Sequence, residues 1–183
     1  MSHLNPPVGP DDHVAGPPDA PVTLVEYGDL ECPYCGRAHP ILKSIQERLG
    51  TGLRFVFRHF PISESHPHAQ HAAEAAEAAG AQGKFWQMHD RIFEHQGAMR
   101  DADLVAHARE LGLDAERVAR ELADGTWTDR VRRDFRSGAR SGVNGTPTFF
   151  INGERYDGDW TDAEGFARAL REAASGAETS LPR

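Results

Sequence analysis

The sequence contains only two cysteines among its 183 residues, and they stand three positions apart as Cys32 and Cys35. Disulfide-rich folds need several well-separated cysteines, so a disulfide scaffold is excluded. A chain of this length buries enough apolar surface to fold without such cross-links. The single cysteine pair is therefore the first feature whose purpose must be explained.

Long apolar runs and an excess of basic residues are also missing. No segment approaches the roughly 18 consecutive apolar residues that a membrane-spanning helix requires, so no membrane partner is expected. The formal net charge is −8 at pH 7. Nucleic acid is bound by basic surfaces, so it is not an expected partner either. The mean hydropathy of −0.57 is typical of a globular protein.

The first residues, Met1–Pro7, lack the basic and apolar regions of a secretory signal peptide. We expect a cytoplasmic protein if Met1 is the natural start, and a periplasmic or extracytoplasmic one if a leader was removed. Five of the twelve prolines lie within residues 1–20, which predicts an extended arm at the N-terminus.

Hydrophobic patterns after this arm predict a strand–helix–strand unit. Val22–Tyr27 is apolar on both faces, as in a central buried strand. Apolar residues at helical spacing follow Cys35, and Leu53–Phe60 then alternates in the manner of a second strand.

The next region, residues 61–143, has only helical patterns and predicts a helical insertion. Strand patterns then return on both sides of Asn152–Gly153, a strong hairpin signal. A capping box at Thr161–Glu164 predicts the start of a last helix. The expected organisation is an extended arm (1–13), an α/β core (14–60 and 144–175), a helical insertion (61–143) and a polar tail (176–183).

The motif Cys32-Pro33-Tyr34-Cys35 lies where the first predicted strand ends and a helix begins. A thiolate, not a thiol, attacks a disulfide, and a helix N-terminus stabilises that anion through its dipole and N–H groups. Cys35, one turn later, could close a disulfide onto Cys32. Half of a zinc site and a chance pair of structural cysteines are the alternatives, but tetrahedral zinc needs further ligands at suitable spacing.

This stretch resembles the active site of the thioredoxin superfamily, and the insertion resembles that of its DsbA-like thiol–disulfide oxidoreductases. Residues 143–153, with Gly145-Thr146-Pro147, are similar to the cis-proline loop and following hairpin of that branch. Pro40 matches the proline that kinks the first helix of thioredoxin, and Lys84–His89 resembles a helix of DsbA-like insertions. The resemblance covers about residues 14–175.

The resemblance implies a thioredoxin fold with an inserted α-helical domain, in a monomer that exchanges disulfides with protein or peptide substrates and with an unidentified redox partner. By the same resemblance, this disulfide exchange needs neither a metal nor an organic cofactor. Cys32 would attack and Cys35 would resolve. The substrate-binding residues would be Pro33, Tyr34, Thr146 and Pro147, with a cis Thr146–Pro147 bond.

Glu26 lies on the strand face shared with Val22 and Leu24. A carboxylate there should be at least partly buried, which would raise its pKa and let it move protons. By resemblance, the equivalent acid sits beneath the cysteine pair and assists cysteine deprotonation. The alternative is a glutamate at a strand edge that reaches solvent.

Other charged residues bear on the pair less directly. Four histidines, at positions 59, 66, 68 and 71, are expected in loops or on the surface rather than in a metal site, because no two are spaced as ligands on one helix face. Asp29 and Glu31 precede Cys32, and the nearest cation in sequence is Arg37. Like charges disfavour a thiolate, so we expect a couple more reducing than the about −120 mV of DsbA, nearer about −200 mV.

Two rival functions stay open at this point. A glutathione-linked reductase of glutaredoxin type would use the same Cys-Pro-Tyr-Cys motif, and it would turn over a glutathionylated substrate. A non-catalytic binding module would keep the fold with an unreactive Cys32. The net direction of electron flow also stays open.

Overall fold

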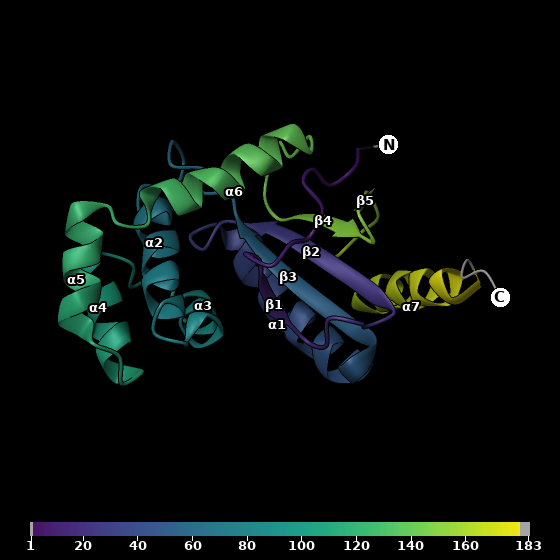
Figure 1. Cartoon of the computed structure of the whole chain (residues 1–183), viewed down its shortest axis with the longest axis horizontal. Helices are drawn as coiled ribbons and strands as arrows, with labels where there is room; N and C mark the ends of the chain where they lie inside the picture. The colour runs from purple at the N-terminus through teal and green to yellow at the C-terminus, as the bar shows by residue number, and fades with distance from the viewer. Residues whose placement is uncertain (1, 180–183) are drawn as a thin grey trace. The chain divides into compact units, whose positions relative to one another are not determined.

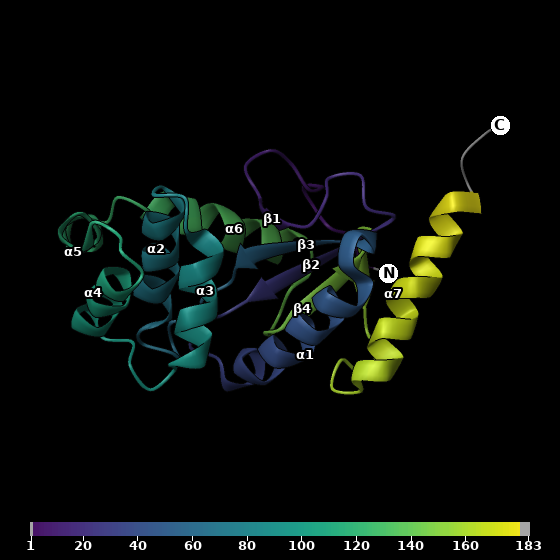
Figure 2. The same ribbon diagram turned by 90° about the horizontal axis from the view of Figure 1, so that it is seen from below.

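The computed structural model describes residues 2–179, and it is a mixed α/β protein (Figures 1 and 2). A short 3-10 turn follows the first helix at Gly50–Gly52. In chain order, the strands and helices are β1 (His13–Ala15), β2 (Val22–Gly28), α1 (Pro33–Leu49), β3 (Leu53–His59), α2 (Ala69–Gly80), α3 (Phe85–Glu94), α4 (Asp101–Glu110), α5 (Ala115–Asp124), α6 (Thr128–Arg140), β4 (Thr148–Ile151), β5 (Glu154–Tyr156) and α7 (Ala163–Thr179).

The chain divides into two compact units. The sheet unit comprises the described residues up to Tyr27, Arg37–Arg58 and the described residues from Ser137 onward. The helical unit comprises Gly28–Gly36 and His59–Arg136. The cysteine turn therefore groups with the helices, whereas the expected organisation placed it in the α/β core.

The sheet unit is built on five strands in the order β1-β3-β2-β4-β5. β1 pairs antiparallel with β3, and β4 pairs antiparallel with both β2 and β5. The arrows of β2 and β3 point the same way in Figure 2, as expected for strands joined through a helix. Six of the seven residues are buried in each of these two strands. The largely apolar sequence of β2 agrees with burial on both faces of the sheet.

The β4–β5 hairpin turns at Asn152 and Gly153, whose φ angles are 48° and 86°. Both residues tolerate this left-handed region, which confirms the predicted turn. The last helix starts at Ala163, one residue later than a cap at Thr161 would place it, because the Asp162 carboxylate, not Thr161, accepts the N–H of Gly165. Phe166 of this helix is buried and its ring lies 5.1 Å from that of Phe149 in β4.

The predicted N-terminal arm is bound to the sheet unit. The N–H of Leu4 donates to the carbonyl of Gly153, and His3 forms a β-bridge with Glu154. Strand β1 starts at His13, the last residue of the expected arm. At the other end, α7 continues to Thr179, so residues 176–179 are helical rather than a tail. Residues 180–183 of that predicted tail lie outside the described residues.

The helical unit contains α2, α3, α4, α5 and most of α6, with no strand among its described residues, as the patterns predicted. The α2 helix is rich in alanine, a strong helix former, and nine of its twelve residues are buried. It packs against α3, α4 and α5. The predicted cap at Asp114 is present, since its carboxylate accepts the N–H of Arg117 at 2.9 Å.

Candidate active site

The cysteine turn joins the end of β2 to the start of α1. Cys32 immediately precedes the helix, and its carbonyl accepts the N–H of Gly36 at 3.0 Å. Both cysteines are buried, but Cys32 keeps 4% of its surface exposed and Cys35 none. Between them, Pro33 and Tyr34 are exposed, and Tyr34 shows 55% of its surface. The turn thus places the slightly exposed residue Cys32 close in sequence to a large exposed aromatic ring.

Helix α1 contributes to the chemistry of Cys32 through its length and direction. It runs for 17 residues from Pro33, so the positive end of its dipole lies at this cysteine. Pro33 occupies the first helical position, where its missing N–H costs no hydrogen bond. The N-terminal groups of α1 favour a thiolate on Cys32 over a neutral thiol.

The carboxylate of Asp29 organises this turn. Its Oδ1 accepts the backbone N–H groups of Glu31 at 2.8 Å and Cys32 at 3.2 Å. Its Oδ2 accepts the N–H of Ile62 at 2.8 Å and lies 2.7 Å from Nδ1 of His66. The Asp29 side chain has no exposed surface. One buried carboxylate therefore ties the cysteine turn to the segment that follows β3.

The same residue contacts the second cysteine through its backbone. The N–H of Asp29 donates to Sγ of Cys35 at 3.5 Å. A sulfur that accepts an N–H bond is stabilised most when it carries negative charge. Asp29 is thus bonded to the backbone of one cysteine and to the side chain of the other.

His66 is a titratable base beside Asp29 that sequence proximity did not reveal. Burial lowers the pKa of His66, but the hydrogen bond and charge of Asp29, with the charges of Cys32 and Glu31, outweigh it and raise the pKa above its usual value. The histidine was expected in a loop, and it is in one. The fold brings that loop to Asp29, which the linear spacing of 37 positions conceals.

Glu31, the second acid before Cys32, is also engaged. Its Oε2 accepts the backbone N–H of His68 at 2.6 Å. By sequence, Asp29 and Glu31 count as like charges near Cys32, with Arg37 as the nearest cation. The fold adds His66 and three backbone donors at Asp29 and one backbone donor at Glu31, which offset part of that like-charge effect.

Gln96, in the loop between α3 and α4, was missed entirely at the level of sequence. Its Nε2 donates to the carbonyls of Leu30 at 2.9 Å and Cys32 at 3.0 Å. Gly36 permits this approach, since a Cβ there would lie 2.3 Å from Oε1 of Gln96. A lone glutamine in a loop carries no motif by which it could have been identified.

The remaining predicted site residues lie in the sheet unit. Glu26 is 1% exposed and stands opposite Phe149 in the β2–β4 ladder. The alternative that it reaches solvent from a strand edge is therefore wrong. The Thr146–Pro147 peptide bond is cis, and both residues are half-buried just before β4.

Another histidine, His59, was expected in a loop or on the surface and is instead buried in the helical unit. Its Nε2 lies 3.0 Å from Oε1 of Glu77, and its backbone N–H donates to Oδ2 of Asp134 at 3.2 Å. The ligand atoms of these three residues lie within 4.8 Å of one another, as in a metal site. Arg130, however, forms ion pairs with both Glu77 and Asp134. A guanidinium already balances the two carboxylates, so the group functions as a buried ion-pair network.

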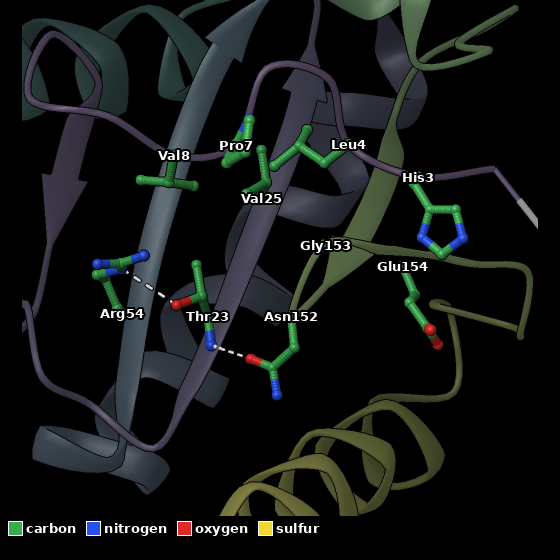
Figure 3. Close-up of a pocket in the computed structure, with 10 residues that line it drawn as sticks. All are labelled: His3, Leu4, Pro7, Val8, Thr23, Val25, Arg54, Asn152, Gly153 and Glu154. Carbon is green, nitrogen blue, oxygen red and sulfur yellow. Dashed lines mark hydrogen bonds between the residues drawn. The ribbon is translucent and has the colours of Figure 1, made fainter.

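A separate pocket of about 540 Å³ opens on the sheet unit (Figure 3). Its polar groups bind one another: Nε of Arg54 donates to Oγ1 of Thr23, whose N–H donates to Oδ1 of Asn152. Leu4, Pro7 and Val8 of the N-terminal arm line its upper side in the figure. None of the predicted site residues lines it.

Comparison with known proteins identifies the family. A family model described as thioredoxin matches residues 9–172. The chain belongs to the thioredoxin family. Among solved structures, BdbD from Bacillus subtilis aligns with a TM-score of 0.82 at 24% identity, covering 90% of this chain and 94% of that one. Wolbachia pipientis alpha-DsbA1 aligns with a TM-score of 0.80 at 20% identity, covering 96% of each chain.

These likenesses confirm the thioredoxin fold with its inserted helical domain and, at the level of fold, the resemblance to DsbA-like proteins. A thioredoxin-like oxidoreductase from Silicibacter pomeroyi DSS-3 is also similar, at 28% identity and a TM-score of 0.76 over 94% of this chain and 95% of that one. Together they support an oxidoreductase.

The similar curated proteins carry another name. The Na(+)/H(+) antiporter NhaA 1 of Salinispora arenicola is 50% identical over 171 residues, which is 93% of this chain and 26% of the antiporter. NhaA 3 of Salinispora tropica is 48% identical over 172 residues, again 93% and 26%. This chain spans about a quarter of the length of these relatives. In the part of the chain that the structure describes, no helix is long and apolar enough to cross a membrane.

Proposed function

We propose that this protein exchanges disulfides with protein or peptide substrates through Cys32 and Cys35. The observation that carries the proposal is the placement of Cys32 at the N-terminus of α1, with a buried partner cysteine one turn later. Membership of the thioredoxin family supports the same chemistry. No cofactor is needed, because the electrons move between sulfur atoms.

In the reducing direction, the Cys32 thiolate attacks one sulfur of a substrate disulfide. A bond forms between Cys32 and that sulfur, and the other substrate sulfur leaves as a thiolate and takes a proton from solvent. Cys35 loses its proton and attacks the mixed disulfide, which forms the Cys32–Cys35 bond and releases the second substrate thiol. The substrate gains two electrons and the cysteine pair loses two. The oxidising direction reverses each step.

Several residues would assist these steps. The exposed Pro33 and Tyr34, together with Thr146 and the cis Pro147, are the proposed substrate contacts. Glu26, buried in β2, is the proposed proton carrier for cysteine deprotonation. An unidentified thiol or disulfide partner would restore the pair, and the protein would act as a monomer without nucleic-acid or membrane partners.

The compartment would decide the net direction of exchange. In a reducing cytoplasm the pair would be largely reduced and would act as a reductase or isomerase. In an oxidising compartment the same pair would act as an oxidase. The proposal covers only the quarter of the antiporter relatives that this chain matches, and ion transport is not part of it.

Trapping of mixed disulfides tests the assignment of the two cysteines. With disulfide-bonded insulin or a disulfide peptide as substrate, Cys35→Ala should accumulate a mixed disulfide at Cys32, because no second thiol releases it. Cys32→Ala should trap none. Equal trapping by both variants, or trapping only by Cys32→Ala, would overturn the assignment.

The two rival functions have separate measurements. A glutaredoxin-type reductase would turn over a glutathionylated peptide faster than an intramolecular peptide disulfide. A non-catalytic binding module would leave Cys32 unreactive toward iodoacetamide at neutral pH. We expect rapid alkylation of Cys32 and a preference for peptide disulfides.

A further inference from the structure

The contacts of Asp29 carry an inference beyond the cysteine chemistry itself. Among the described residues, its buried carboxylate joins the backbone of Cys32 on one oxygen to the imidazole of His66 on the other. We infer that Asp29 and His66 form a positioning pair, in which the charge of His66 controls how readily Cys32 becomes a thiolate. This inference rests on the proposed function.

Asp29 is suited to the role by its four contacts. Three come from backbone N–H groups and the fourth from the His66 ring, so both oxygens act as acceptors. An ionised carboxylate has only acceptors and matches such a set of donors. Since the side chain is fully buried, its negative charge is poorly screened by water. Without a nearby cation, this charge would oppose a second anion on Cys32.

His66 supplies that cation. The groups that act electrostatically on its ring are Asp29, Cys32 and Glu31, all from the turn before α1. The neighbouring histidine, His68, reaches this turn through its backbone N–H, which binds Glu31. The negative charge of Cys32 raises the pKa of His66, and by linkage a protonated His66 must favour the Cys32 thiolate by the same free energy.

The consequence is that the reactivity of Cys32 depends on the protonation of His66 as well as on its own. While His66 is protonated, it compensates Asp29 and the thiolate is favoured. When His66 loses its proton, the anionic Asp29 is left beside Cys32 and the thiolate is disfavoured. Because stabilisation of the reduced form raises the reduction potential, protonation of His66 makes the pair a stronger oxidant than it would otherwise be.

His66→Gln tests the inference on the full chain. The rate of Cys32 alkylation by iodoacetamide, followed from about pH 5 to about pH 9, reports the thiolate fraction without any substrate turnover. At about pH 6 we expect a rate roughly three- to tenfold lower than that of the unaltered protein, since a tenfold change corresponds to one pKa unit. The equilibrium constant with glutathione should change by the same factor. A tenfold change makes the reduction potential of the pair more reducing by about 30 mV.

His66→Arg supplies the rescue. Arginine keeps its charge throughout this pH range, so the fast alkylation should return while the step due to the imidazole disappears. A loss of packing alone would not produce this pattern.

His71→Gln is the matched control, because His71 also pairs with an aspartate, Asp101, at 2.6 Å in the same unit but in an exposed position. It should leave alkylation unchanged. Equal rates for His66→Gln and the unaltered protein, or equal slowing by His71→Gln, would overturn the inference.

The proposed function can fail separately. If the unaltered protein exchanges no disulfide with insulin while the alkylation pattern holds, the pair tunes a thiol that has another use. If exchange persists and the alkylation pattern is absent, only the role of His66 is refuted.

Discussion

Each unit of the molecule buries an aspartate beside a cation, but the two cations differ in kind. In the sheet unit, Nε of Arg58 lies 2.8 Å from Oδ1 of Asp12, and the two side chains are 3% and 8% exposed. In the helical unit, Asp29 is paired with His66. Burial lowers the pKa of Arg58, yet its hydrogen bonds to Asp12 and Tyr27 raise it further above an already high value.

The difference separates structural from functional use of buried charge. Arg58 is protonated at every physiological pH, so its pair with Asp12 holds the N-terminal arm permanently, helped by bonds to the carbonyls of Pro6 and Pro7. Histidine is the side chain that titrates near neutral pH, so the charge beside Asp29 can be lost. A permanent pair suits anchoring, and a titratable pair suits control of a neighbouring thiol.

Arg58→Met should have the largest effect on stability. It leaves the buried carboxylate of Asp12 without its cation, which costs about 3–5 kcal/mol of the free energy of unfolding. Urea unfolding followed by circular dichroism measures the loss. Alkylation of Cys32 should be unchanged in the variant under folding conditions, because Arg58 serves the other unit.

The exposed pair Arg48–Glu164 provides the control for this prediction. Its two hydrogen bonds, at 2.7 and 2.9 Å, resemble those of Arg58 in geometry, but the side chains are 37% and 70% exposed. Arg48→Met should therefore leave the urea midpoint nearly unchanged, because water screens an exposed ion pair. A similar loss in both variants would show that burial does not distinguish the two arginines.

Gln96→Ala should have an intermediate effect. The change removes the donor to two carbonyls of the cysteine turn, Leu30 and Cys32, at a cost of about 1–3 kcal/mol. The cost should appear in urea unfolding at any pH, because no titrating group is involved. A loss that varies between about pH 6 and about pH 9 would contradict this account.

The stability contributed by His66 should depend on pH, in contrast to that of Arg58. The pKa of His66 is raised in the folded state, so its contribution is fully present below the unfolded pKa of 6.5 and is lost as pH rises through the folded value. The difference in unfolding free energy between the unaltered protein and His66→Gln should therefore shrink from about pH 6 to about pH 9. The corresponding difference for Arg58→Met should stay constant over this pH range. A parallel decline in the differences for both variants would contradict the contrast between the two pairs.

Glu31→Gln should have the smallest effect. It removes one negative charge near Cys32 while an amide oxygen can still accept the N–H of His68. Alkylation of Cys32 should become at most a few-fold faster, and equilibration with glutathione should shift toward a more oxidising couple by a similar factor. No shift would show that Glu31 does not influence the reduction potential of the pair, and a more reducing couple would contradict the expected sign.

The sequence by itself determined the features that depend on neighbours along the chain. Continuous apolar residues predicted β2 as a buried central strand, alternation predicted β3, and the run of helical patterns predicted the insertion. Asn152–Gly153 predicted its hairpin, because few residues adopt positive φ angles. The Cys-Pro-Tyr-Cys motif between a strand and a helix identified the cysteine pair, since a helix N-terminus acts on whatever residue precedes it.

Only the tertiary structure decided which distant groups surround that pair. His66 follows Asp29 by 37 positions, and Gln96 follows Cys32 by 64, so no local pattern connects them. Electrostatic and hydrogen-bond energies depend on distances of a few ångströms in space. Counting charges along the chain therefore gave Arg37 as the nearest cation to the cysteine pair, whereas the folded helical unit also places His66 and three backbone donors at Asp29.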